Sequence, residues 1–168
     1  MVCKPVQRSR RRLISPRIAP LVLAAALAAP CFAQYPATIE RVKPSIVAVG
    51  TFEPTRNPQF KFAGTGFAVG DGSLIATNEH VVPGLLKVDR NETIAVAARL
   101  ADGAMRVLPA KVAAADRSSD LVLLKVAGLS LPPLPLGDSS NVREGELYLF
   151  TGFPIGTVLG IFPVTHRT

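Results

Sequence analysis

Residues 64–82 read GTGFAVGDGSLIATNEHVV, and this stretch decides the fold. Two short apolar runs flank the sequence GDG at residues 70–72. Because glycine tolerates the positive φ that tight turns need, the stretch predicts two antiparallel strands joined by a hairpin. The GTG at 64–66 lacks the further glycines, the lysine and the following helix of a phosphate-binding loop. It indicates instead a strand residue pair that allows close backbone approach.

Similar short runs, rich in Val, Ile, Leu and Phe, are separated by Gly, Pro, Asp and Asn. They lie at residues 45–53, 92–100, 105–115, 120–127, 146–153 and 160–166. Regular short strands with turn signals predict an antiparallel sandwich or barrel. Residues 36–45 are predicted as a short helix that ends near Pro44, because proline disfavours helix at the preceding residue. The proline-dense segment 129–137 predicts a stiff connection between two substructures.

Composition favours a folded domain without nucleic-acid partners. The chain has 168 residues, of which 48% are hydrophobic and 18% charged, so we expect a packed core in one domain or two small ones. The formal charge is +7, but residues 1–33 hold six basic residues and no acidic one. Residues 34–168 therefore carry 13 basic and 12 acidic side chains, a balance that argues against binding to nucleic acid.

Residues 1–33 are predicted to be a signal peptide. A basic segment precedes the apolar run IAPLVLAAALAAP. CFA before Gln34 fits a signal-peptidase cleavage site, which requires small side chains. The alternative is an uncleaved membrane anchor. The apolar run disfavours it, because about 13 residues are short of the roughly 20 that span a bilayer. We therefore expect an exported protein, periplasmic or secreted, without a stable membrane anchor after cleavage. SRRRLI at 9–14 leaves twin-arginine export open.

The cysteines exclude several kinds of site. Both, Cys3 and Cys31, lie in the leader. Residues 34–168 therefore have no disulfide, no cysteine zinc site and no thiol nucleophile.

A histidine and an aspartate form the candidate catalytic pair. The chain has two histidines, His80 and His166, and either alone would more often be an ordinary polar residue. His80 follows a predicted strand, and Asp120 opens the apolar run 120–127. An acid at the mouth of such a strand is costly to bury without a partner, and an imidazole N–H is suitable. That pairing would hold the imidazole as the base that activates a hydroxyl nucleophile.

Three segments together resemble the HtrA/Deg group of trypsin-like serine proteases. They are GTGFAVGDGSLIATNEHVV, AADRSSDLVLLKV at 114–126, and LPLGDSSNVREGELYLFTGFPIG at 134–156. The resemblance implies that His80 is the general base and Asp120 its orienting carboxylate, with Asp116 as the competing acid. It also implies that no metal or cofactor is needed.

The same resemblance implies a mainly β protein with the trypsin-like double β-barrel. Residues 34–43 would be a short helical lead-in, and residues 44–130 would form a complete first barrel with His80 and Asp120. Residues 131–168 would be the opening strands of an incomplete second barrel.

Ser139 in LGDSS is expected to be a turn residue rather than the nucleophile. In the HtrA/Deg group the nucleophile lies further on, in a GNSGG type motif whose glycines let N–H groups converge on the oxyanion. Ser139 is followed by Ser140 and Asn141 instead of glycines, and no serine follows Ser140. The 168 residues are therefore predicted to lack the nucleophile and to be inactive by themselves.

The implied reaction is acyl transfer to a serine followed by hydrolysis, with exported proteins or peptides, misfolded ones included, as substrates. A full-length parent could form homo-oligomers. Two alternatives stay open: a truncated, non-catalytic binding protein of the cell envelope, or an unrelated β-rich exported protein.

Overall fold

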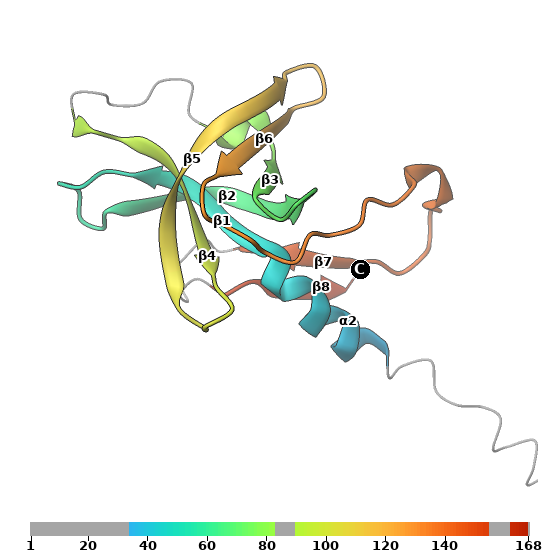
Figure 1. Cartoon of the computed structure of the whole chain (residues 1–168). Coiled ribbons are helices and arrows are strands. Elements are labelled where there is room, and N and C mark those ends of the chain that lie inside the picture. The colour runs from blue at the N-terminus through green and yellow to red at the C-terminus, as the bar shows by residue number, and fades with distance from the viewer. Residues whose placement is uncertain (1–33, 83–89, 155–161, 168) are drawn as a thin grey trace, which may run out of the picture. The chain divides into compact units, whose positions relative to one another are not determined.

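The computed structural model describes residues 34–82, 90–154 and 162–167 (Figure 1). The predicted signal peptide at 1–33 lies outside the described residues. Six antiparallel strands close into a barrel in the order β1-β2-β3-β6-β5-β4, which confirms the prediction of a mainly β barrel fold. Their bounds are β1 (Ile46–Phe52), β2 (Phe60–Val69), β3 (Leu74–Thr77), β4 (Thr93–Arg99), β5 (Met105–Asp116) and β6 (Leu121–Val126).

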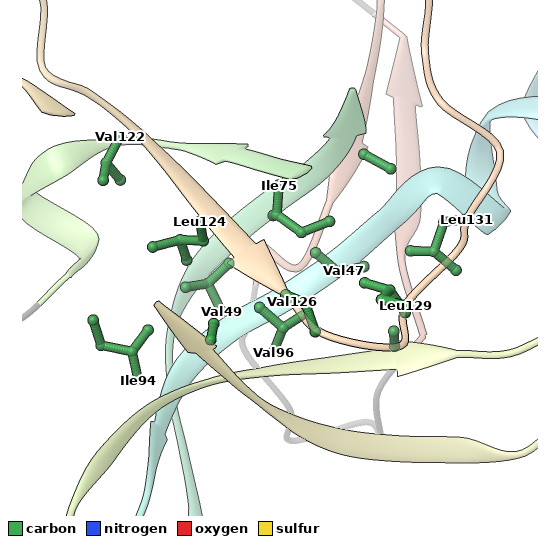
Figure 2. Packing of buried hydrophobic residues seen from close by; sticks show 13 residues of the cluster. Val47, Val49, Ile75, Ile94, Val96, Val122, Leu124, Val126, Leu129 and Leu131 are labelled. Carbon is green, nitrogen blue, oxygen red and sulfur yellow. The ribbon is translucent and has the colours of Figure 1, made fainter. Parts of the chain in front are cut away.

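The barrel interior is filled by aliphatic side chains from all six strands and from the segment after β6 (Figure 2). Val47, Ile75, Val96 and Leu124 are fully buried there. Each such side chain contributes about 2 kcal/mol by leaving water. Because the ring of strands is closed, each strand pairs with a neighbouring strand on both sides.

The β2–β3 hairpin has the turn that GDG predicts. Gly70 and Gly72 have φ values of 61° and 81°, which glycine adopts without strain. A Cβ at Gly72 would lie 2.0 Å from the carbonyl oxygen of Leu131. The proline-dense connection therefore packs on the hairpin: the N–H of Leu131 donates to Gly72 O at 3.1 Å, and that of Leu134 to Ala68 O at 2.8 Å.

The helix predicted before the barrel is present and slightly displaced. Helix α2 (Gln34–Val42) ends two residues before Pro44, and the 3₁₀ turn η2 (Lys43–Ser45) leads directly into β1. Proline disfavours the α-helical conformation at the residue before it, so the change of helix type falls between Val42 and Lys43.

A two-stranded antiparallel sheet follows the connection. It consists of β7 (Leu149–Gly152) and β8 (Val164–Arg167), shorter than the runs expected at 146–153 and 160–166. Pro163 has no N–H for a strand ladder, which accounts for the start of β8 at Val164. The sheet is fixed to the barrel by Phe153, whose ring meets Phe62 edge-on at 6.0 Å and whose N–H donates to Thr65 Oγ1 at 3.0 Å.

Candidate active site

The strand register brings together the segment after β3 and the segment before β6. These strands are antiparallel, and their ladder ends with Thr77 opposite Val122. Asn78 and the 3₁₀ turn η3 (Glu79–Val81) follow β3, while Asp120 immediately precedes β6. The N–H of Glu79 donates to the Asp120 carbonyl at 3.2 Å. Residues 40 positions apart in sequence are therefore neighbours at one end of the barrel.

Strand β2 leaves room for η3 at Gly64. A Cβ at Gly64 would lie 2.6 Å from Val81 Cγ2 and 2.8 Å from Val81 Cγ1. Since glycine has no Cβ, Val81 packs closely over β2 and against the main core cluster. GTG predicted close backbone approach, whereas the atoms that approach Gly64 belong to the Val81 side chain. It sets the height of η3 above the barrel, and with it the position of His80.

His80 and Asp120 form two contacts. The imidazole Nδ1 lies 2.6 Å from Asp120 Oδ2, and the backbone N–H of His80 donates to Asp120 Oδ1 at 3.0 Å. The side chains are 71% and 44% exposed. The pair is thus formed as the sequence suggested, but Asp120 is at the surface and not buried at the mouth of the strand.

The negative charge on Asp120 determines which ring nitrogen of the neutral His80 imidazole carries the proton. The backbone N–H of His80, assisted by its imidazole and by Asn78, holds the pKa of Asp120 below its ordinary value. An ionised carboxylate only accepts hydrogen bonds, so Nδ1 carries the ring proton and Nε2 presents its lone pair. Among the described residues, none forms a hydrogen bond with Nε2. This nitrogen is therefore available to accept a proton from a reacting group.

The backbone of Asp120 adopts an uncommon conformation. Its φ of 51° lies in the left-handed region, which non-glycine residues seldom occupy. Its carbonyl accepts hydrogen bonds from Glu79 N and, at 3.1 Å, from Asn78 Nδ2. On the outer side, Arg117 Nε lies 3.2 Å from Glu79 Oε1 and forms a second link between the two segments. Such locally strained residues recur at functional sites because surrounding contacts must hold them.

The other candidates lie elsewhere. Asp116 accepts hydrogen bonds from Ser118 and Ser119 and so closes the β5–β6 turn. Ser139 begins the 3₁₀ turn η5 (Ser139–Asn141), which Asp138 caps by accepting from Ser140 N at 2.9 Å. His166 lies on β8 opposite Phe150.

Among the described residues, no serine hydroxyl is hydrogen-bonded to His80. Of the sequence candidates, the structure therefore brings together His80 and Asp120 alone.

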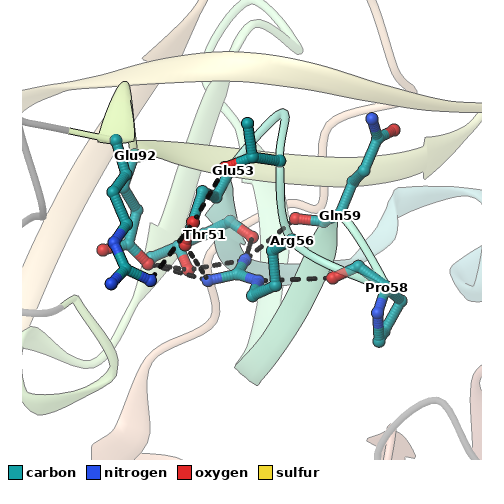
Figure 3. Close-up of polar contacts among 8 residues, drawn as sticks. Thr51, Glu53, Arg56, Pro58, Gln59 and Glu92 are labelled. Carbon is teal, nitrogen blue, oxygen red and sulfur yellow. Dashed lines mark hydrogen bonds and ion pairs between the residues drawn. The ribbon is translucent and has the colours of Figure 1, made fainter.

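Sequence reasoning missed an arginine network around the β1–β2 loop (Figure 3). Arg56 lies in the β1–β2 loop, and its guanidinium donates to Glu92 Oε1 at 2.9 Å and to the carbonyl oxygens of Thr51 and Gln59 at 2.7 and 2.9 Å. It also lies 3.5 Å from Glu53, whose side chain is only 4% exposed. The network fixes the β1–β2 loop to Glu92, which immediately precedes β4. Arg56 and Glu92 are far apart in sequence, so no local sequence pattern predicts this network.

Two kinds of feature are absent from the described part of the chain. No cluster of three or more His, Cys, Asp or Glu that could hold a metal ion occurs within residues 34–82, 90–154 and 162–167. Over the same ranges, no helix is long and apolar enough to cross a membrane.

A histidine oriented by a carboxylate, with its second ring nitrogen free, is the general-base unit of hydrolases that use a hydroxyl nucleophile. Residues 64–161 match the family model described as "Trypsin-like peptidase domain". This match spans more than half of the 168 residues, so the chain belongs to the trypsin-like peptidase family. Curated relatives that match the chain are named as serine proteases of the HtrA and DegP types.

Two curated relatives illustrate this placement. "Serine protease HTRA2, mitochondrial" of Drosophila pseudoobscura pseudoobscura is 35% identical over 108 residues, which is 62% of this chain and 23% of that protein. "Probable periplasmic serine endoprotease DegP-like" of Pseudomonas putida is 37% identical over 101 residues, which is 60% of this chain and 19% of that protein. The chain thus spans about a quarter or less of the length of these relatives.

Solved structures share the fold. The crystal structure of Deg5 superimposes with a TM-score of 0.63 at 23% identity, over 83% of this chain and 64% of that one. The HtrA-type protease AlgW with decapeptide gives a TM-score of 0.56 at 24% identity, over 77% and 43% of the two chains.

Proposed function

We propose that residues 34–168 supply the base and its orienting carboxylate to the active site of an exported serine endopeptidase. The observation that carries the proposal is the 2.6 Å contact between His80 Nδ1 and Asp120 Oδ2, while no residue that the structure describes is hydrogen-bonded to Nε2. The HtrA/Deg relatives, which are named as serine proteases, support the same reaction class.

In the proposed reaction, His80 Nε2 takes the proton from a serine hydroxyl as the oxygen attacks a peptide carbonyl. Asp120 stabilises the imidazolium that forms, and it keeps the ring from rotating. The imidazolium then gives its proton to the leaving amine, and a water molecule repeats the sequence to release the acyl group. No step requires a metal or a cofactor. The substrates would be proteins or peptides, unfolded ones included.

The nucleophile is proposed to come from outside residues 1–168. What supports this is that every serine of residues 34–168 lies in the described ranges and none is hydrogen-bonded to His80. The 168-residue chain alone should therefore hydrolyse no peptide, and a fluorophosphonate probe should not label it. Labelling of Ser139 in this chain would contradict the proposal.

The test is hydrolysis of a fluorescent unfolded protein by the natural gene product that contains these residues. His80→Ala should lower kcat about 1,000-fold or more, whereas the matched control His166→Ala should retain full activity. Equal turnover by the His80→Ala variant and the natural protein would refute the assignment of His80. An intact, folded gene product without any turnover would instead favour the non-catalytic envelope protein.

Export is proposed on separate grounds. The composition of residues 1–33 and the word "periplasmic" in the name of the Pseudomonas putida relative support it. The mature protein should begin at Gln34 when its N-terminus is sequenced. A cytoplasmic protein that begins at Met1 would contradict both the signal peptide and the location.

A further inference from the structure

Asn78 donates two hydrogen bonds to Asp120 through one amide nitrogen. Its Nδ2 lies 3.1 Å from the Asp120 carbonyl oxygen and 3.2 Å from Asp120 Oδ2. Oδ2 is also the atom that receives His80 Nδ1, while Oδ1 receives the backbone N–H of His80. The two carboxylate oxygens are thus held by different donors, and Asn78 contributes to the one that faces the imidazole.

The Asn78 side chain does not cap the 3₁₀ turn that it precedes. Asn78 is the N-cap residue of η3, where an asparagine side chain ordinarily accepts from a backbone N–H of the turn. Its side chain makes no such capping bond here. The link between the two segments does not depend on it either, because Glu79 N binds the Asp120 carbonyl and Arg117 pairs with Glu79. What remains distinctive about Asn78 is its contact with the carboxylate.

The carboxylate needs this support because it is accessible. The Asp120 side chain is 44% exposed and the His80 side chain 71%. Water therefore competes for Oδ2, and the imidazole can rotate away. Among the described residues, the donors left to the carboxylate without Asn78 would be His80 N, which holds Oδ1, and the imidazole itself.

We propose that Asn78 is a positioning residue that holds Asp120 Oδ2 towards His80 Nδ1 and so keeps the neutral imidazole protonated on Nδ1. The effect of Asn78 on the His80 tautomer does not require enzymatic activity, but a contribution of Asn78 to catalysis rests on the function proposed above. Asn78 acts through Asp120 and does not itself contact the reacting atoms.

The test measures the tautomer of His80 directly. Imidazole nitrogen-15 shifts are recorded on the 168-residue chain at a pH where the ring is neutral, for the natural protein and for Asn78→Ala and Asn78→Asp. Asn78→Ala removes the donor, and Asn78→Asp keeps the shape but replaces the donor with a second carboxylate. His166 is the internal control, and Asn141→Ala is the matched control because Asn141 lies at the exposed turn η5.

The ratio of Nδ1–H to Nε2–H tautomer at His80 should fall about fivefold in Asn78→Ala, the effect of losing one ordinary hydrogen bond. It should fall further in Asn78→Asp, where two carboxylates repel each other. His166 and the Asn141→Ala variant should be unchanged. An unaltered His80 ratio in both Asn78 variants would overturn the proposal. Loss of the folded amide spectrum in both would overturn it as well, because Asn78 would then be holding the barrel together.

Kinetics on the natural gene product separate this inference from the proposed function. Asn78→Ala should lower kcat about fivefold with KM unchanged. Full kcat in Asn78→Ala, with activity lost in His80→Ala, would reject the role of Asn78 and keep the protease. A tautomer shift in a gene product without any hydrolytic activity would keep the positioning role and reject the protease.

Discussion

Replacing Gly64 with alanine tests whether the packing of β2 sets the position of His80. The new Cβ would lie 2.6 Å from Val81 Cγ2, whereas carbon atoms in contact are about 3.5–4.0 Å apart. Val81, and η3 with it, must therefore move by about 1 Å. Overpacking of this kind costs roughly 1–3 kcal/mol. A shift of that size also breaks a 2.6 Å contact between His80 and Asp120.

The measurement is thermal unfolding together with the imidazole spectrum of His80. Gly64→Ala should lower Tm by roughly 5–10 °C, since 1 kcal/mol corresponds to about 3–5 °C in a domain of this size. It should also lower the Nδ1–H fraction at His80. Gly137→Ala is the matched control, because nothing lies within 4 Å of a Cβ at Gly137. Its Tm should stay constant or rise slightly.

The double variant Gly64→Ala, Val81→Ala provides a second check. Removing the two methyl groups that clash should make the double variant more stable than the sum of the two single changes predicts. Additive losses, or an unchanged His80 spectrum in Gly64→Ala, would refute the argument that this glycine positions η3.

Two further predictions concern charge. Arg56→Met should lower the unfolding free energy by about 3 kcal/mol in a denaturant titration, because Glu53 and Glu92 are nearly buried and lose their shared cation. Arg106→Met is the control: it breaks an exposed ion pair and should lower the unfolding free energy by less than about 1 kcal/mol. Equal losses would contradict this account. The pKa of Asp120 is lower in the folded chain, so its stabilising effect is present above about pH 4, the unfolded value, and is lost as the pH falls through the folded value. The Tm advantage of the natural chain over Asp120→Asn should therefore shrink between pH 5 and pH 3, and a constant difference would contradict the assignment.

The barrel was predictable from the sequence because its signals are local. Alternating apolar runs and the turn glycines Gly70 and Gly72 mark the strands and the hairpin wherever the rest of the chain lies. The pairing of His80 with Asp120 was predictable only in part. The apolar strand after Asp120 suggested a buried acid, while the register of β3 against β6 places it at the exposed barrel end.

The residues that hold this pair escaped prediction because each acts across a long stretch of chain. Asn78 lies two residues before His80 in sequence, but its side-chain amide binds Asp120, 42 positions away. Arg56 and Glu92 are 36 positions apart. Nothing in the composition around these residues distinguishes such contacts from ordinary polar surface, since they follow from the closure of the barrel.

The account depends most on His80 being the base that activates a serine, and chemical labelling tests this directly. The natural gene product that contains residues 1–168 is treated with a fluorophosphonate probe, with and without the His80→Ala change, and the labelled residue is identified by mass spectrometry. We expect one labelled serine, outside residues 1–168, in the natural protein and none in the variant. Labelling that survives the loss of His80, or a natural protein that is folded and never labelled, would contradict the central claim.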